Sequence, residues 1–341
     1  MDEPRGRIVR AMDGVEFRGV SYRIGARTLL DDFTVAVAAG ETLALVGASG
    51  AGKTTVLKLV NRLLLPEAGD VCVQGRDTRE WDPIRLRRSV GYVIQDVGLF
   101  PHLTVADNVA VLPRLEQWPD DRVAARVREL LELIGLPPGE YSARWPDELS
   151  GGQRQRVGVA RALAVDPPVL LMDEPFGALD PITRTALQDE FLRILRELRK
   201  TIVFVTHDID EALKMGSRVA ILRAGRLVQY ARPEALLARP ADDFVAEFVG
   251  TDRALKRLAL LRVADYARPL DSPALRATGA LPRIGPDDSL REALAAMLAA
   301  DADAVLVADG NGATGAAITL TTIREAAGAG GYARSNGASA A

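Results

Sequence analysis

Residues 47–54 read Gly47-Ala48-Ser49-Gly50-Ala51-Gly52-Lys53-Thr54 and fill the pattern G-x-x-x-x-G-K-[ST]. A strand-like apolar run precedes them, and a run with apolar residues at helical spacing follows. In this context the glycines let backbone N–H groups point at a polyphosphate, at the positive end of the helix. Lys53 is expected to reach the β- and γ-phosphates, and the Thr54 hydroxyl to ligate Mg²⁺. The pattern therefore predicts a nucleotide-binding loop rather than a Gly-rich turn with an incidental lysine.

The composition is that of a globular protein of about two domains. Its 341 residues have a formal net charge of −3 and a pI near 5.7, which give no electrostatic reason to expect a nucleic-acid partner. The single cysteine, Cys72, excludes an intrachain disulfide and fits a reducing compartment. The N-terminal residues lack the apolar core of a signal peptide, and no apolar run is long enough to span a membrane. We therefore expect a cytoplasmic protein whose membrane role, if any, comes through a partner.

Polar residues follow three buried strand-like runs downstream of the loop. They are Gln95, the pair Asp173 and Glu174, and His207. In open parallel sheets, ligands bind beyond the carboxyl ends of the strands. In that position Asp173 fits the Mg²⁺ shell and Glu174 fits activation of the attacking water, while Gln95 suits either the metal or the water. For Gln95 the alternative is an ordinary loop residue, and for His207 a structural histidine.

A second anion-binding helix end is predicted at residues 149–153, Leu149-Ser150-Gly151-Gly152-Gln153. This segment directly precedes a helix expected from about residue 154 to 164. A hydroxyl and free N–H groups at a helix N-terminus face the same point, which suits a phosphate. The sequence thus contains two phosphate-binding helix ends.

The remaining pattern alternates strands with helices, which predicts a layered α/β core. Strand-like alternation covers residues 12–41, a helix capped by Asp120-Asp121 is expected to continue to Ile134, and residues 219–230 form a hairpin over Ala224-Gly225. Tyr22, ahead of the loop, is open to two interpretations: stacking on an adenine ring or an ordinary strand aromatic.

Together these motifs resemble the ATP-binding subunit of ABC transporters over roughly residues 12–250. The resemblance implies an ABC-type P-loop nucleotide-binding domain. Such a domain has a RecA-like core, an antiparallel β subdomain and an inserted helical subdomain, here at about residues 96–165. It also implies an ATPase, or translocase, that uses ATP and Mg²⁺, and it favours the stacking role for Tyr22.

The resemblance assigns roles residue by residue. The residues implied for ATP binding are Tyr22, Gly47, Ala48, Ser49, Gly50, Ala51, Gly52, Lys53, Thr54 and Thr55. The residues implied for catalysis are Glu174 as general base, His207 and Gln95. The residues implied for Mg²⁺ binding are Thr54, Gln95 and Asp173. The signature residues Ser150, Gly151, Gly152 and Gln153 are expected to act across a dimer, with Asp180 in the adjoining D-loop.

The resemblance also implies partners and a location. Two copies of the chain are expected to face each other head to tail, each ATP lying between Lys53 of one copy and Ser150 of the other. Closure would be transmitted through the Gln95 region to integral membrane permease subunits, and an external solute-binding protein would deliver the substrate. The chain would then sit peripherally on the cytoplasmic face of the bacterial inner membrane.

Residues 61–77, 81–105 and 172–184 narrow the resemblance to bacterial importers of osmoprotectants. The solutes implied are glycine betaine, choline, carnitine and proline betaine. An importer of methionine or another amino acid is the alternative within transport. A soluble ABC ATPase acting on chromosomes is disfavoured because residues 96–149 are too short for a coiled coil. A ribosomal ABC ATPase is disfavoured because that type has two cassettes per chain and this chain has one. A mainly regulatory binding module is disfavoured because the set of hydrolytic residues is complete.

The amino-acid composition changes after residue 250. Residues 251–261 are expected to form a short helical linker, and 262–326 resemble one CBS repeat with a capping box at Ser289 and Glu292. Residues 327–341, rich in Gly, Ala and Ser, are expected to be a disordered tail. Thr322 stands where adenosine-binding repeats usually have an acid. A lone repeat is expected to leave an apolar sheet face uncovered, with Val305, Val307 and Ile318, and so to pair with a second copy.

Overall fold

The computed structural model describes residues 14–95, 97–177, 180–269, 281–308 and 315–328. The chain divides into two compact units, Met1–Tyr230 and Ala231–Ala341. None of the helices in the described part is long and apolar enough to cross a membrane. The predicted tail falls almost wholly outside the described residues.

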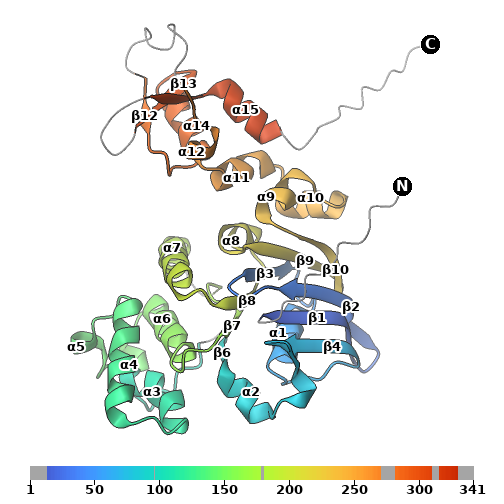
Figure 1. Cartoon of the computed structure of the whole chain (residues 1–341), viewed down its shortest axis with the longest axis vertical. Helices are drawn as coiled ribbons and strands as arrows, with labels where there is room; N and C mark the ends of the chain where they lie inside the picture. Colours follow the sequence, from blue (N-terminus) through green and yellow to red (C-terminus); the bar gives the residue numbers. More distant parts are fainter. Residues whose placement is uncertain (1–13, 96, 178–179, 270–280, 309–314, 329–341) are drawn as a thin grey trace. The chain divides into compact units, whose positions relative to one another are not determined.

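The centre of the first unit is a six-stranded sheet with the order β10-β9-β3-β8-β7-β6 (Figure 1). Strands β9, β3, β8, β7 and β6 run parallel, and β7 and β8 are buried along their whole length, as central parallel strands are. Parallel strands end at one edge, so Gly47, Asp173 and Thr206 lie along the same side of the sheet. The strands are β3 (Thr42–Gly47), β6 (Val90–Val93), β7 (Val169–Asp173), β8 (Thr201–Thr206), β9 (Arg218–Arg223) and β10 (Arg226–Ala231).

A second, antiparallel sheet has the order β2-β1-β4-β5. Phe17 and Phe33 pack edge to face in its core, with ring centroids 5.2 Å apart. Cys72, on β4, is 7% exposed and is a free thiol. The elements of this region are β1 (Val15–Ile24), β2 (Arg27–Val37), β4 (Ala68–Val73), β5 (Arg76–Asp77), the 3₁₀ turn η1 (Thr78–Glu80) and α2 (Pro83–Ser89).

Helices complete the first unit, and those between β6 and β7 form a separate lobe in Figure 1. Within the lobe, the buried Asn108 side chain accepts a hydrogen bond from Phe100 N (2.8 Å) and donates to Phe100 O (3.1 Å), which fixes the loop after Gln95. The helices are α1 (Lys53–Val60), α3 (Val105–Leu115), α4 (Asp120–Leu133), α5 (Pro138–Tyr141), η2 (Pro146–Glu148), α6 (Gly151–Ala162), α7 (Pro181–Leu198) and α8 (Ile209–Met215).

Two local predictions for these helices were wrong. The N-cap of α4 is Pro119, without a side-chain cap, so Asp120 and Asp121 lie inside the first turn, where they still complement the helix dipole. The apolar run predicted as a helix after the loop continues past α1, which ends at Val60, and Leu63 beyond it is 51% exposed. In both cases the type of element was correct and its boundary was not.

The second unit has a four-stranded sheet with the order β11-β14-β13-β12. Its core includes Leu290, Met297 and Ile318, and α14 begins with the predicted capping box of Ser289 and Glu292. The sequence also predicts a turn at residues 309–312, which lies outside the described residues. The elements are α9 (Pro233–Ala238), α10 (Asp243–Val249), α11 (Arg253–Leu260), α12 (Val263–Tyr266), β11 (Arg268–Pro269), β12 (Arg283–Ile284), α14 (Leu290–Ala299), β13 (Ala304–Val307), β14 (Ala316–Thr319) and α15 (Leu320–Gly328).

The second unit corrects two expectations about the C-terminal region. Helix α11 is not a mere linker, because its Leu258 is 2% exposed and belongs to the core of this unit. The sheet face with Val305, Val307 and Ile318 is covered within the chain, at 0%, 9% and 0% exposure. The argument that this face requires a second copy therefore fails. Leu298, on α14, is 73% exposed.

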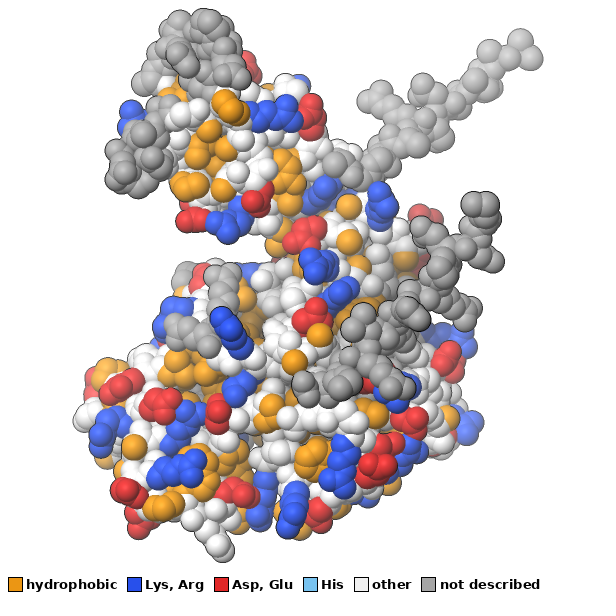
Figure 2. Space-filling model, viewed as in Figure 1, with side chains coloured by type: hydrophobic (Ala, Val, Ile, Leu, Met, Phe, Trp, Pro, Cys, Tyr) orange, Lys and Arg blue, Asp and Glu red, His pale blue; other side chains and the backbone are white. Residues whose placement is uncertain are grey.

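The visible surface of the first unit mixes charged side chains of both signs (Figure 2). Blue and red side chains alternate over the lobe of α3, α4 and α5 without a single-sign field. This distribution agrees with the nearly balanced composition of 43 basic and 46 acidic residues.

Candidate nucleotide-binding site

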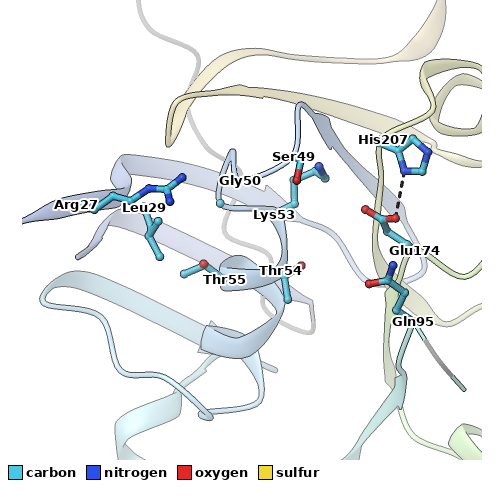
Figure 3. A pocket seen from close by; sticks show the side chains of 11 residues that line it. Arg27, Leu29, Ser49, Gly50, Lys53, Thr54, Thr55, Gln95, Glu174 and His207 are labelled. Carbon is cyan, nitrogen blue, oxygen red and sulfur yellow. Dashed lines mark hydrogen bonds and ion pairs between the residues drawn. The ribbon is translucent and has the colours of Figure 1, made fainter. Parts of the chain in front are cut away.

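An open pocket of about 480 Å³ lies at the carboxyl edge of the central sheet, around the 47–54 loop (Figure 3). It brings the loop together with residues from the ends of β6, β7 and β8 and from the start of β2. Its lining residues are Arg27, Leu29, Ser49, Gly50, Gly52, Lys53, Thr54, Thr55, Gln95, Glu174 and His207.

The glycines of the loop have the backbone conformation that the motif requires. Gly50 and Gly52 have φ of 76° and 102°, in the left-handed region that favours glycine. A Cβ on Gly52 would lie 2.3 Å from the Leu29 carbonyl oxygen, so a side chain there would clash with β2. The loop is thus shaped by glycine and held close beneath the antiparallel sheet.

Lys53 is the buried cation of the pocket, at 6% exposure. Its Nζ donates hydrogen bonds to Gly47 O (2.7 Å) and Ala48 O (3.1 Å), which hold the ammonium inside the loop. Burial lowers the pKa of Lys53, and the nearby carboxylates of Glu174 and Asp173 oppose this shift. A polyphosphate in the loop would compensate this buried charge.

Thr54, which lines the pocket, contacts Asp173 at the end of β7. Thr54 Oγ1 donates a hydrogen bond to Asp173 Oδ1 at 3.2 Å. Burial raises the pKa of Asp173, and burial followed by the Asp173 charge raises the pKa of Tyr92 to about 12. The chain therefore presents a hydroxyl and a carboxyl oxygen side by side beneath the loop.

Glu174 and His207 face each other across the end of the sheet, as the dashed line in Figure 3 shows. Glu174 Oε2 lies 3.1 Å from His207 Nδ1, within hydrogen-bond distance. Glu174 N donates to Val205 O at 3.0 Å, and the Glu174 backbone adopts a φ of 42°, which is uncommon for a side chain of this size. The strained turn directs the carboxylate into the pocket.

Gln95 lines two cavities. It faces the nucleotide pocket on the side of Glu174, and it also lines a second cavity of about 430 Å³. Pro101, Gly151, Arg154 and other residues of the helical lobe form that second cavity. Gln95 therefore connects the pocket to the lobe.

The signature segment begins a helix but does not line the pocket. Ser150 caps α6: its Oγ accepts from Gln153 N (3.2 Å), and its N–H donates to Gln153 Oε1 (2.8 Å). Ser150 and Gly151 are exposed. Asp180 is also exposed, and its carbonyl accepts from Arg184 N at the start of α7 (2.9 Å).

Tyr22 lies on β1, and its stacking on an adenine ring stays a prediction. It is partly buried, packs against the hydrophobic core and is not among the lining residues described for the pocket. The register of β1 is irregular around it, at Phe17/Val20, Val20/Tyr22 and Tyr22/Arg23.

Arg27 and Leu29 of β2 line the pocket, and sequence reasoning missed both. Nη2 of Arg27 lies 3.0 Å from the position of a Cβ built on Gly50, so the guanidinium is beside the loop. In Figure 3 it points from β2 towards Gly50. The sequence signal is weak, because only the packing of β2 over Gly52 brings this strand to the pocket.

We predict that Arg27→Ala raises the Kd for ATP by about tenfold, the effect of losing one charge-assisted contact. Arg23→Ala is the control, because Arg23 is exposed and pairs with Glu67 at 2.8 Å, outside the pocket. Equilibrium titration with a fluorescent ATP analogue measures both variants. Equal affinities would show that Arg27 does not contact the nucleotide.

Comparison with known proteins agrees with this geometry. The family model described as ABC transporter matches residues 30–177. The chain is 47% identical over 283 residues to an osmoprotectant import ATP-binding protein of Salmonella typhimurium, covering 83% of this chain and 72% of that protein. The chain belongs to the ABC transporter family. As an ATP-binding subunit of this family it is an ATPase coupled to solute import, as predicted.

Other ABC proteins extend the comparison. A choline transport ATP-binding protein of Bacillus subtilis is 50% identical over 232 residues, covering 68% of this chain and 61% of that protein. A dimeric ATP-binding cassette solved in a post-hydrolysis state with ADP and Pi has a TM-score of 0.57 and 32% identity, covering 64% of this chain and 98% of that chain. The predicted ABC ATPase fold is confirmed, while the CBS resemblance stays a prediction.

Proposed function

We propose that this ABC ATPase drives import of an osmoprotectant, a quaternary amine such as glycine betaine, choline or carnitine. The observation that supports ATP hydrolysis is the pocket in which Lys53, Glu174 and His207 lie around the phosphate-binding loop. The solute is supported by two relatives, which serve osmoprotectant import in Salmonella typhimurium and choline transport in Bacillus subtilis. The chain spans 72% and 61% of these two proteins.

Glu174 is the proposed general base. Its carboxylate accepts a proton from water as that water attacks the γ-phosphate, which is expected to contribute about 10²–10⁴-fold to the rate. His207 Nδ1 holds this carboxylate at 3.1 Å, and its exposed ring is free to face the γ-phosphate. Lys53 supplies positive charge where the phosphate oxygens would lie, and the loop N–H groups supply hydrogen bonds.

Thr54 Oγ1 and Asp173 Oδ1, 3.2 Å apart, are oxygen donors of the kind that Mg²⁺ prefers, and Gln95 lines the same pocket. These residues fit the metal, and we propose that Thr54 and Gln95 hold it directly and Asp173 through water. When bound, Mg²⁺ would neutralise charge on the β- and γ-phosphates.

Ser150 is proposed to act on ATP bound by a second copy of the chain. It lies outside the pocket of its own chain and is exposed at the N-terminus of α6, which suits contact across a dimer. The related cassette solved with ADP and Pi is dimeric, which supports the same arrangement here. Gly151, Gly152 and Gln153 belong to this proposed surface, and Asp180 to the adjoining one.

The membrane partners are proposed to dock at the cavity that Gln95 shares with the helical lobe. This 430 Å³ cavity is lined by residues of both α6 and the loop after Gln95, so a short helix of a permease subunit seated there would touch the pocket through one side chain. The ATPase would thus be peripheral on the cytoplasmic face of the inner membrane. An external solute-binding protein would deliver the solute to the permease.

The second unit is proposed to contain one CBS-like repeat at residues 262–326. Its support is the order of β12, α14, β13, β14 and α15 and the capping box that begins α14. Because its sheet face is covered within the chain, the repeat needs no partner to complete its core.

Uptake assays test the solute. The chain, produced with its permease and binding subunits in a host without osmoprotectant importers, is expected to accumulate radiolabelled glycine betaine, choline or carnitine but not methionine. The same system with Glu174→Gln controls for ATP-driven uptake. Methionine uptake alone would favour the amino-acid importer, and ATPase activity with no association to the permease would favour a soluble ABC ATPase.

A further inference from the structure

Glu211 is a buried carboxyl group directly behind the catalytic pocket. It lies in the first turn of α8 and is 5% exposed. Its Oε2 accepts a hydrogen bond from Thr206 Oγ1 at 3.2 Å, while its Oε1 is buried and has no hydrogen-bond partner among the described residues. An ionised carboxylate that is buried with an unpaired oxygen is costly, so this environment favours the neutral acid.

The charges around Glu211 do not compensate an ionised carboxylate. Asp208 on the same turn and Glu174 at the end of β7 are negative, and Arg184 on α7 is the cation that acts on it. Arg184 also lies 3.9 Å from Asp208 Oδ2, so its charge is shared. Burial, the largest effect, raises the pKa of Glu211 to about 8. Glu211 is therefore neutral below about pH 8 and ionised above it.

The hydrogen bonds of Glu211 lead to both neighbours of His207. Thr206 Oγ1, which donates to Glu211, also accepts from Asp208 N at 3.0 Å. Asp208 Oδ1 in turn accepts from Glu211 N at 3.3 Å. The exposed His207 ring forms its one described hydrogen bond with Glu174. The orientation of the ring is therefore set by the backbone on each side.

We propose that Glu211, in its neutral acid form, is a positioning residue that holds the turn Thr206–Asp208 so that His207 Nδ1 meets Glu174. The inference rests on the proposed roles of Glu174 and His207 in hydrolysis. Ionisation of Glu211 would place a buried negative charge near Glu174 and Asp208 and would disturb this turn. The ATPase then loses kcat as the pH rises through about 8, while its KM for ATP changes little.

The test uses kcat and KM for ATP of the assembled transporter from about pH 6 to about pH 9.5. Glu211→Gln, the isostere of the neutral acid, is expected to keep kcat within about twofold at neutral pH and to lose the alkaline decline of the parent protein. Glu211→Ala is expected to lower kcat by about tenfold or more with little change in KM. Asp189→Asn, which removes an exposed carboxylate paired with Lys214 of α8, is the control and should retain the parent profile.

Two outcomes would overturn the positioning role. One is a kcat for Glu211→Gln as low as that of Glu211→Ala, which would mean that the ionised form is needed. The other is an unchanged kcat and pH profile for every Glu211 variant. If Glu174→Gln is inactive while Glu211 variants behave as the parent does, the positioning inference alone fails. If Glu174→Gln keeps normal turnover, the proposed catalytic role itself fails.

A second measurement keeps the inference testable if Glu211→Ala does not fold. The chain has only two histidines, His102 and His207, so their imidazole NMR signals can be assigned with a His102→Gln variant. Glu211→Gln is expected to leave the His207 signals unchanged at neutral pH and to remove a shift that the parent shows near pH 8. Identical His207 titration in both proteins would contradict the inference.

Discussion

Glu174→Gln is expected to slow ATP hydrolysis about 10²–10⁴-fold while ATP still binds, because the amide cannot accept the proton of the attacking water. The amide can still accept a hydrogen bond from His207, now 3.1 Å from Glu174 Oε2, so the shape of the pocket should persist. Steady-state phosphate release and equilibrium ATP binding by the purified transporter measure the two effects separately.

Asp189→Asn is a suitable control for the loss of one carboxylate, since Asp189 pairs with Lys214 on the surface of α7 and α8. Normal turnover by Glu174→Gln would remove Glu174 from the role of general base. Loss of ATP binding together with turnover would point instead to damage of the loop.

A mixed dimer tests whether each ATP site is shared between two copies of the chain or is complete within one copy. One copy with Lys53→Ala and the other with Ser150→Arg should retain one intact ATP site if each site combines Lys53 of one copy with Ser150 of the other. We expect about one ATP trapped per mixed dimer when both copies also contain Glu174→Gln, which prevents turnover. The reason is the exposed position of Ser150 outside the pocket of its own chain.

The matched control puts Lys53→Ala and Ser150→Arg in the same copy and leaves its partner intact. Shared sites then contain one defect each, and no ATP should be trapped. The reverse pattern, with ATP retained in this control and absent from the first dimer, would establish that each chain completes its own site.

Much of the site was predictable because its residues are tied to local patterns. The 47–54 loop requires glycine at defined positions, and polar residues after buried parallel strands converge on one edge of a sheet. Gln95, Glu174 and His207 accordingly lie together around Lys53. The type of each secondary-structure element followed from the spacing of apolar residues. Helix ends such as Val60 depend instead on contacts that this spacing does not encode.

The features that sequence reasoning missed depend on distant packing. One is the irregular register of β1, which alternation in the sequence does not reveal. Arg27 reached the pocket because β2 crosses the loop. Glu211 looks in the sequence like a typical acid of a first helical turn, and only the folded chain shows that its carboxyl group is buried.

Cys72 gives the chain a practical chemical property. It is the one cysteine of the sequence, it is 7% exposed, and burial raises the pKa of its thiol. Because maleimides and spin-label reagents attack the thiolate, the native protein should be almost inert towards them. A cysteine introduced at the exposed Arg154 would then be the preferred site of labelling, so distances between two copies could be followed by spectroscopy without first removing a native thiol.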